Sequence, residues 1–549
     1  MTNNKYYFWL SLSIIVAILF SFSGLKPAFA SIYTVQDDAR QHVFWMYQFS
    51  DRDLFSNDLI AKYFSSVAPF GYKSLYLLAN FLGIEPFLFN KILPLIIGIV
   101  TSIYIFLVCL ELLPVPFAGF VAALLLNQNL WMLDDIVSGT PRAFFYLLFL
   151  AFVYYLLRLS LLPCLLAIIL QGLFYPQVVL ISTTILVIRL IYNWLISRSL
   201  KFFYLIGLVL AILILGIYAL QTSEFSQVIS LETAKSLAEF YPGGRNSFFI
   251  DNSIAFWLVG QRSGFFPREW QYVLLSSFGL CLPILKLYPR RFPLVTKIDC
   301  KIEIIWQILL ASLLMFALAH LFLFKLHLPS RYSQHSLRIL IALINGIAIA
   351  IMINGITKNI GKYKKLLKPL ITVTIITLLL YPTYAVQAYD YRLGYETGTA
   401  TKLYQFLQQQ PKDILIASLS QEADFIPSLA KRSVLTAQEY SIPYHLDYYL
   451  PIRQRTQDLI GAQYSDSLTE IKTFISKYNI DLWLIDKNAF TVNYLQNNNW
   501  LQQFKSETNQ AIALLQENKS PAILSKINDC SIFTETNLIL LNAKCIKEQ

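Results

Sequence analysis

The stretch FLFNKILPLIIGIVTSIYIFLVCLELL, residues 87–113, decides the fold class. It is almost wholly apolar and is long enough to cross a hydrocarbon core of about 30 Å as one helix. Similar runs recur as far as Tyr384, and 56% of all residues are hydrophobic whereas only 14% are charged. The composition therefore predicts a polytopic α-helical membrane protein.

Polar breaks divide this apolar part, residues 1–388, into about eleven transmembrane helices. We expect them at Tyr6–Leu25, Phe87–Leu113, Phe117–Leu130, Pro141–Arg158, Leu162–Phe174, Val178–Ile196, Phe203–Leu220, Tyr272–Leu287, Ile304–Phe324, Ile339–Ile356 and Leu370–Tyr384. An A-x-A pattern at Ala28–Ala30 leaves a cleaved signal peptide as the alternative to a first span. We favour the uncleaved span, because the apolar run is longer than the core of a usual signal peptide.

Basic residues set the orientation of these spans. The two strongest groups, Lys286–Lys301 and Lys358–Lys368, both fall on the cytoplasmic side if the amino terminus is cytoplasmic. The segment after the last span is then extracytoplasmic, and the protein is expected in a cell inner (plasma) membrane as a multi-pass protein. The net charge of +11 reflects these helix ends, and no basic–aromatic motif points to nucleic acid.

The segment 389–549 has the mixed composition of a soluble domain. Short buried strands are predicted at 414–418, 432–435, 481–485 and 538–541, with helices at 401–409, 466–477 and 509–517. This alternation predicts a small α/β domain. Cys530 and Cys545 would form a disulfide there if the domain is extracytoplasmic. No Cys/His metal spacing occurs, so a zinc or redox site is not expected.

Two outer loops connect the spans. Residues 31–85 are polar and aromatic, and short helices lying along the membrane interface are expected there. Five aromatic residues suit the headgroup zone, namely Trp45, Tyr47, Tyr63, Phe64 and Tyr72. The second loop, residues 221–270, carries Arg245 next to two glycines, which either makes it a mobile substrate-binding residue or marks a plain turn.

The first outer loop opens with VQDDARQHVFWMY, residues 35–47. In a helix starting here, Asp38 and His42 share a face, and Asp37 lies three residues from Arg40. We predict that Asp37 and Asp38 are catalytic, with Asp38 favoured over Asp37, although acids at this place could simply cap the helix. The literal D-x-D at Asp51–Asp53 precedes a turn and is expected to be solvated.

Further polar residues map to the same outer face and could converge on one cavity, where such groups at membrane depth indicate function. The candidates for donor binding are Arg40, His42, Asp134, Asp135, Arg142, Arg245, Arg331, Tyr332, His335 and Arg338. Asp134 and Asp135 could equally cap a helix, and Arg331–Arg338 could bind lipid headgroups instead. A polar–aromatic group in the tail, Glu439–Asp447, is expected to be a surface loop.

These residue types suit transfer of a sugar from a lipid-linked donor. Arginines can stabilise a departing phosphate, and a carboxylate can take the proton of an acceptor hydroxyl. With its first span, its acidic outer loop, about eleven spans and its outer carboxyl-terminal domain, the chain resembles the GT-C class of membrane glycosyltransferases. In that class an acid of the first outer loop is catalytic or binds metal, and Asp37 and Asp38 hold the matching positions here.

The resemblance implies an enzyme that uses a polyprenyl-phosphate sugar and transfers it to a lipid, glycan or protein acceptor outside the membrane, with no cofactor. The first motif is Asp-Asp rather than Asp-x-Asp, and no WWD-type motif occurs in the tail. These departures disfavour an oligosaccharyltransferase and favour metal-independent transfer. Two alternatives stay open: a transporter or flippase of lipid-linked glycans, and a non-catalytic assembly partner with the same shape.

Overall fold

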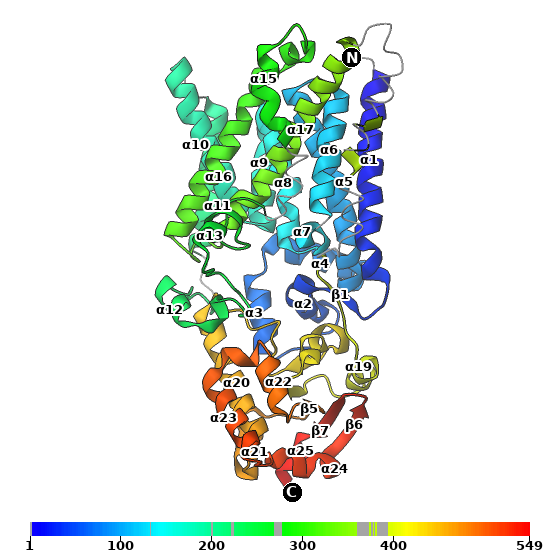
Figure 1. Ribbon diagram of the computed structural model, residues 1–549, viewed down its shortest axis with the longest axis vertical. Coiled ribbons are helices and arrows are strands. Elements are labelled where there is room, and N and C mark those ends of the chain that lie inside the picture. The colour runs from blue at the N-terminus through cyan, green and yellow to red at the C-terminus, as the bar shows by residue number, and fades with distance from the viewer. Residues whose placement is uncertain are drawn as a thin grey trace.

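The computed structural model describes the chain in nine segments: residues 3–131, 133–198, 201–220, 224–267, 277–359, 373–374, 377, 379–381 and 393–548. The molecule is elongated, with a helical bundle at one end and the carboxyl-terminal strands and helices at the other (Figure 1). Of the predicted last span, residues 370–384, the structure describes only 373–374, 377 and 379–381, and the rest lies outside the described residues.

Within the described residues, six helices are long and apolar enough to cross a membrane. They are α1 (Asn3–Leu25), α5 (Pro86–Leu112), α10 (Gln177–Ser197), α11 (Phe202–Leu220), α16 (Ile304–Leu321) and α17 (Ser330–Asn359). Shorter helices complete the bundle, namely α6 (Pro116–Leu130), α8 (Phe144–Leu157), α9 (Leu161–Phe174) and α15 (Leu282–Leu287). The count of about eleven crossings stays a prediction.

Small residues let the central helices approach closely. A Cβ atom added to Gly346 of α17 would meet the Cβ of Ala122 in α6 at 2.8 Å, so only glycine allows this contact. The Trp131 ring lies against Gly24 of α1 and Gly98 of α5 in the same way. Packing of this kind replaces the hydrophobic driving force that helices lack inside lipid.

The first outer loop forms short elements as expected: β1 (Thr34–Gln36), α2 (Asp37–Val43), α3 (Leu59–Val67) and α4 (Phe70–Phe81), with the 3-10 helix η2 (Phe44–Phe49). The prediction that its aromatic residues lie among lipid headgroups is wrong. Trp45, Tyr47, Tyr63, Phe64 and Tyr72 are all buried. The reason is the cover provided by other parts of the chain: the Tyr63 ring, for example, stacks on Tyr448 with centroids 3.7 Å apart.

The carboxyl-terminal part contains a five-stranded sheet of order β4-β3-β5-β7-β6. Its strands are β3 (Leu415–Ser418), β4 (Ser433–Val434), β5 (Leu482–Asp486), β6 (Ser531–Glu535) and β7 (Leu538–Asn542), of which β3 is parallel to β4 and β5. The helices are α19 (Thr401–Gln408), α20 (Leu446–Tyr464), α21 (Leu468–Tyr478), α22 (Val492–Asn497), α23 (Lys505–Gln516), α24 (Ile527–Cys530) and α25 (Ala543–Glu548). A disulfide joins Cys530 to Cys545, whose Cα atoms lie 5.6 Å apart.

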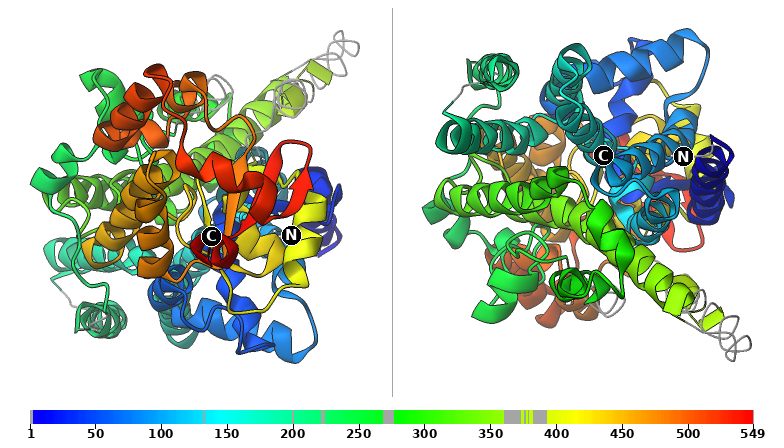
Figure 2. Two further views of the ribbon diagram at one scale, coloured as in Figure 1. Left: turned by 90° about the horizontal axis from the view of Figure 1, so that it is seen from below. Right: turned by 90° about the horizontal axis from the view of Figure 1, so that it is seen from above.

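This carboxyl-terminal part covers one end of the bundle (Figure 2, left). Strand β1 pairs with β2 (Tyr395–Thr397) in an antiparallel register that matches Thr34 with Thr397. The second outer loop, with α12 (Leu231–Ser236) and α13 (Ser253–Val259), reaches the same interface, because Val228 forms a β-bridge with His445. One hydrophobic core therefore runs from the bundle through the first outer loop into the carboxyl-terminal part.

Candidate functional site

Helix α2 places Asp38 at the interface between the bundle and the carboxyl-terminal part. The Gln36 side chain accepts a hydrogen bond from the Ala39 backbone N–H and so caps the helix. Both acids lie in the first helical turn, where negative charge stabilises a helix. The helix starts at Asp37, and the Asp37 carboxylate forms an ion pair with Arg40, three residues on.

Arg142 lies at the centre of a group of acids that we call the Arg142 cluster: Asp38, Asp134, Asp135 and Arg142. Its Nη2 atom lies 2.8 Å from Asp38 Oδ2 and 2.9 Å from Asp134 Oδ2. Its Nε atom lies 3.5 Å from Asp135 Oδ1. Acids from two loops that are far apart in sequence thus share one guanidinium at the start of α8.

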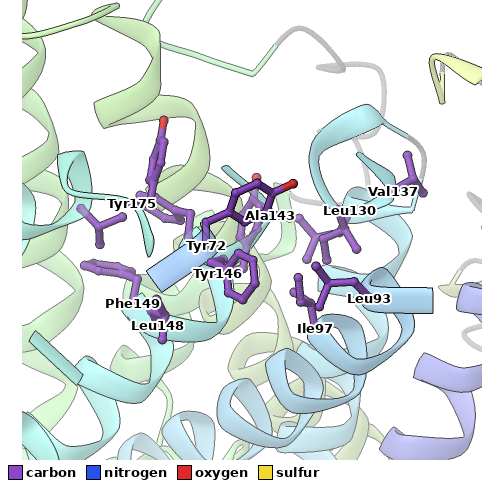
Figure 3. Close-up of a cluster of buried hydrophobic side chains, with 14 of the residues drawn as sticks. Tyr72, Leu93, Ile97, Leu130, Val137, Ala143, Tyr146, Leu148, Phe149 and Tyr175 are labelled. Carbon is purple, nitrogen blue, oxygen red and sulfur yellow. The ribbon is translucent and has the colours of Figure 1, made fainter. Parts of the chain in front are cut away.

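The two adjacent acids of the cluster differ in their surroundings. Asp135 is buried, pairs with Arg338, and accepts a hydrogen bond of 2.8 Å from the Tyr146 hydroxyl. His335 Nδ1 lies 2.8 Å from the same hydroxyl, and Figure 3 shows Tyr146 among apolar side chains. Asp134, by contrast, keeps 37% of its side chain exposed. Asp135 therefore braces α17 against the loop before α8, whereas Asp134 stays partly exposed beside Arg142.

Asp38 is the other accessible carboxylate, with 32% of its side chain exposed. Burial disfavours its charged form, but Arg142 outweighs this effect and lowers the pKa of Asp38. The charges of Arg331 and Arg245 act in the same direction. Burial and the neighbouring Asp38 raise the pKa of Asp134 despite Arg142. Asp38 is thus an accessible acid of the cluster whose pKa is lowered, whereas the pKa of the equally accessible Asp134 is raised.

Two arginines near Asp38 have no carboxylate partner among the described residues. Arg331, at the start of α17, forms no side-chain ion pair there and is half-buried. Arg262, which the sequence analysis missed, donates only to the Asn246 side-chain oxygen, at 3.1 Å, and its Nε atom is buried without a partner. Burial lowers the pKa of Arg262, and the charges of Arg245 and Arg331 lower it further, so these arginines lie close together.

Arg262 could not be singled out from its sequence context, because Gln261–Gly264 reads as an ordinary loop. Its position becomes informative only in the fold, where its backbone carbonyl accepts a hydrogen bond from Ser330, beside Arg331. Tyr332 does not face this group, since its hydroxyl donates to the Leu326 carbonyl at 2.6 Å. The two neighbouring candidates therefore differ: Arg331 acts on Asp38, whereas the Tyr332 side chain is buried within the protein.

A second polar cluster lies around Glu439 of the carboxyl-terminal part. Its carboxylate lies 3.0 Å from Arg40 and 2.7 Å from Arg245, and it also accepts a hydrogen bond from Gln41. Asp37 is part of this cluster because its carboxylate forms an ion pair with Arg40. The expectation that the Glu439 segment is a surface loop is wrong, because the two outer loops cover it and leave Glu439 buried. This Glu439 cluster joins both outer loops to the carboxyl-terminal part.

His42 lies one turn after Asp38 as predicted, with its Nδ1 atom buried and without a hydrogen-bond partner in the described part of the chain. Burial lowers the pKa of His42 even though Asp38 raises it, so the ring is neutral at pH 7.

The acids of the Arg142 cluster do not present a set of ligands for a metal ion. Carboxylate oxygens of Asp38, Asp134 and Asp135 face guanidinium N–H groups, and Arg338 adds a second positive charge beside them. In the segments that the structure describes, no group of three or more His, Cys, Asp or Glu side chains is arranged to hold a metal. A divalent cation, which the GT-C resemblance allows, does not fit this arrangement of charges.

Comparison with solved structures identifies the fold. The apo crystal structure of the Archaeoglobus fulgidus oligosaccharyltransferase has a TM-score of 0.53 at 12% identity, over 94% of this chain and 72% of that chain. AglB from the same organism, in complex with an inhibitory peptide and a dolichol-phosphate, has a TM-score of 0.51 at 12% identity, over 97% and 73%. No family model and no curated protein matches the sequence. The predicted resemblance is confirmed at the level of the fold: this chain has the GT-C fold of a membrane oligosaccharyltransferase.

Proposed function

We propose that this protein is a membrane glycosyltransferase that takes a sugar from a polyprenyl-phosphate donor and transfers it at the membrane face covered by residues 393–548. One observation carries the proposal: the ionised carboxylate of Asp38 lies in the field of two arginines, Arg262 and Arg331, that have no carboxylate partner among the described residues. A dianionic phosphate would supply the missing counter-charge. The GT-C fold supports the same reading.

The donor half of the reaction requires stabilisation of a leaving phosphate. As the bond between the anomeric carbon and the phosphate oxygen breaks, both bonding electrons go to that oxygen. Arg331 and Arg262 can then form charge-assisted hydrogen bonds to the phosphate, which strengthen as its charge grows. Arg245 already pairs with Glu439, so it holds the second outer loop in place rather than offering a free guanidinium.

The acceptor half requires a group that takes a proton. The attacking hydroxyl becomes acidic only while its oxygen bonds to the anomeric carbon, so a carboxylate that is ionised beforehand can accept the proton as the bond forms. Asp38 meets this condition because its pKa is lowered and its side chain is accessible. Arg142 keeps it oriented at 2.8 Å. Asp37 pairs with Arg40 of the Glu439 cluster, which makes Asp38 the preferred catalytic base of the two carboxylates.

The likeness to AglB also supports the choice of donor. That protein forms a complex with a dolichol-phosphate and an inhibitory peptide, so a lipid monophosphate and a protein acceptor both fit this fold. Lipids and glycans stay open as acceptors here. We infer that the site faces the extracytoplasmic side of an inner membrane and that the amino terminus is cytoplasmic. The basic groups of the sequence support this orientation, because such groups are expected at the cytoplasmic ends of the spans. The disulfide in the carboxyl-terminal part supports that side, since disulfides persist outside the cytoplasm.

A non-catalytic assembly partner is the second candidate, because each acid of the Arg142 cluster is held in an ion pair. In that case the acids would only stabilise the interface.

Binding of polyprenyl phosphate to the purified full-length protein tests the proposal. We expect the double variant Arg262→Gln/Arg331→Gln to bind at least on the order of 100-fold more weakly, since it removes two charged hydrogen bonds that contribute about 1.5–3 kcal/mol each. Arg52→Gln is the matched control, because Arg52 is an exposed arginine of the first outer loop. If the double variant and the wild type bind polyprenyl phosphate with equal affinity, Arg262 and Arg331 do not form the donor site.

A further inference from the structure

A groove of about 690 Å³ lies on the bundle surface between α1 and α5, and its lining includes no residue of the Arg142 cluster. Helix α1 runs along one edge of the bundle and ends near the carboxyl-terminal part (Figures 1 and 2). The groove is lined mainly by apolar side chains, and two lysines complete it. The residues that matter here are Phe22, Lys26, Phe29, Lys91, Ile92 and Leu95.

Neither lysine of the groove forms an ion pair among the described residues, although the charge of Glu85 acts on Lys91. The ammonium group of Lys91 donates a hydrogen bond of 3.4 Å to the Ser31 carbonyl. Its ammonium also lies 5.8 Å from the centre of the Phe29 ring. Lys91 lies in the second turn of an apolar helix that is long enough to span the membrane. An unpaired cation at such a position is costly unless an anion accompanies it.

The apolar lining is exposed although it is hydrophobic. Phe22 is 66% exposed and Phe29 is 57% exposed, so the groove opens toward the surroundings of the bundle rather than into its core. A ligand that fills it must therefore combine a hydrocarbon chain with an anionic head at the level of the two lysines. A free phosphate ion would satisfy the lysines and leave the apolar walls uncovered.

We propose that this groove binds an anionic glycerophospholipid, with one acyl chain along Phe22, Ile92 and Leu95 and the phosphodiester between Lys26 and Lys91. The lysine stems lie against the apolar walls and their ammonium groups reach the headgroup. Each lysine favours an anionic over a zwitterionic headgroup through its charge. The bound lipid fixes α1 against α5 at the end of the bundle from which the chain continues into β1. The proposal does not depend on glycosyl transfer.

Native mass spectrometry of the full-length protein, released from micelles with equal phosphatidylglycerol and phosphatidylcholine, tests the inference. We expect retained phosphatidylglycerol on the wild type and on Lys26→Arg/Lys91→Arg, and a loss on the order of 10-fold on Lys26→Ala/Lys91→Ala. The control Lys62→Ala/Lys73→Ala removes the same charge outside the groove: Lys62 pairs with Glu224, and Lys73 lies over the Trp45 ring. It should retain the lipid.

Three results would overturn the proposal. One is equal retention of phosphatidylglycerol by the double alanine variant and the wild type. Another is equal retention of phosphatidylcholine and phosphatidylglycerol by the wild type. The third is displacement of the bound phosphatidylglycerol by a small excess of polyprenyl phosphate, which would make the groove part of the donor site. A melting temperature of the alanine variant equal to that of the control ensures that a loss of lipid does not reflect unfolding.

Discussion

Replacing Arg142 with alanine should destabilise the protein more than any other single change in the polar site. The substitution leaves Asp38 and Asp134 without their shared guanidinium, while Asp135 keeps Arg338. Removing one partner of a buried ion pair costs about 3–5 kcal/mol, and the partial exposure of Asp38 and Asp134 puts the expected loss near the lower end, about 3 kcal/mol. If a unit of roughly 200 residues unfolds cooperatively, that loss lowers the melting temperature by roughly 6–12 °C.

The assay is the apparent melting temperature of the detergent-solubilised protein at one fixed scan rate, because unfolding of a protein of this kind is usually irreversible. Arg158→Ala is the matched control on the same helix: Arg158 is 53% exposed and lies 3.9 Å from Glu111, so its loss should cost less than about 1 kcal/mol. Adding Asp38→Asn and Asp134→Asn to Arg142→Ala should restore part of the stability. The reasoning is refuted if Arg142→Ala melts no lower than Arg158→Ala.

Three further outcomes are expected. Cys530→Ala/Cys545→Ala should lower the free energy of unfolding by about 3 kcal/mol, because the disulfide no longer restricts a loop of 15 residues in the unfolded chain. The melting temperature should fall, and an unchanged melting temperature would contradict this prediction. Glu439→Gln should speed proteolytic cleavage of the loop 224–267, because Arg245 loses its buried partner; cleavage at the wild-type rate would speak against a joining role. Folding lowers the pKa of Asp38, so the ionised carboxylate contributes to the free energy of unfolding. This stabilisation is fully present above the pKa of about 3.9 in the unfolded chain and is lost as the pH falls through the lower pKa of the folded protein. The difference in melting temperature between the wild type and Asp38→Asn should therefore stay constant from pH 8 to 5, and a difference that shrinks between pH 7 and 5 would count against the assignment.

Much of the architecture follows from apolar run length and from the positions of charged residues. The long helices lie where the hydrophobic stretches predict them, since a helix in lipid must satisfy its backbone hydrogen bonds within itself. Four of the five strands in the carboxyl-terminal sheet were also predicted. Strand β6, SIFTE, was missed because it is an edge strand with few apolar residues, and its side chains alternate between intermediate and exposed.

The site was predictable only in part. That Asp38, Asp134 and Arg142 lie on one side of the membrane follows from topology, but the shared guanidinium depends on how the two loops fold. Burial of Glu439 was not predictable, because it requires two outer loops to close over a segment about 400 residues away from Arg40. Arg262 gave no local signal for the same reason: its importance comes from its place near Asp38 without an ion-pair partner among the described residues.

The most direct test of the central claim is the fate of the lipid-linked sugar in cells that carry Asp38→Asn. The control is Asp53→Asn, since Asp53 is 80% exposed in the same outer loop. At equal protein levels, the account predicts that Asp38→Asn abolishes the surface glycan that is lost on gene deletion, and that the polyprenyl-phosphate sugar accumulates, while the control behaves as wild type. A normal glycan and no accumulated donor in Asp38→Asn cells would contradict the account and favour the non-catalytic assembly partner.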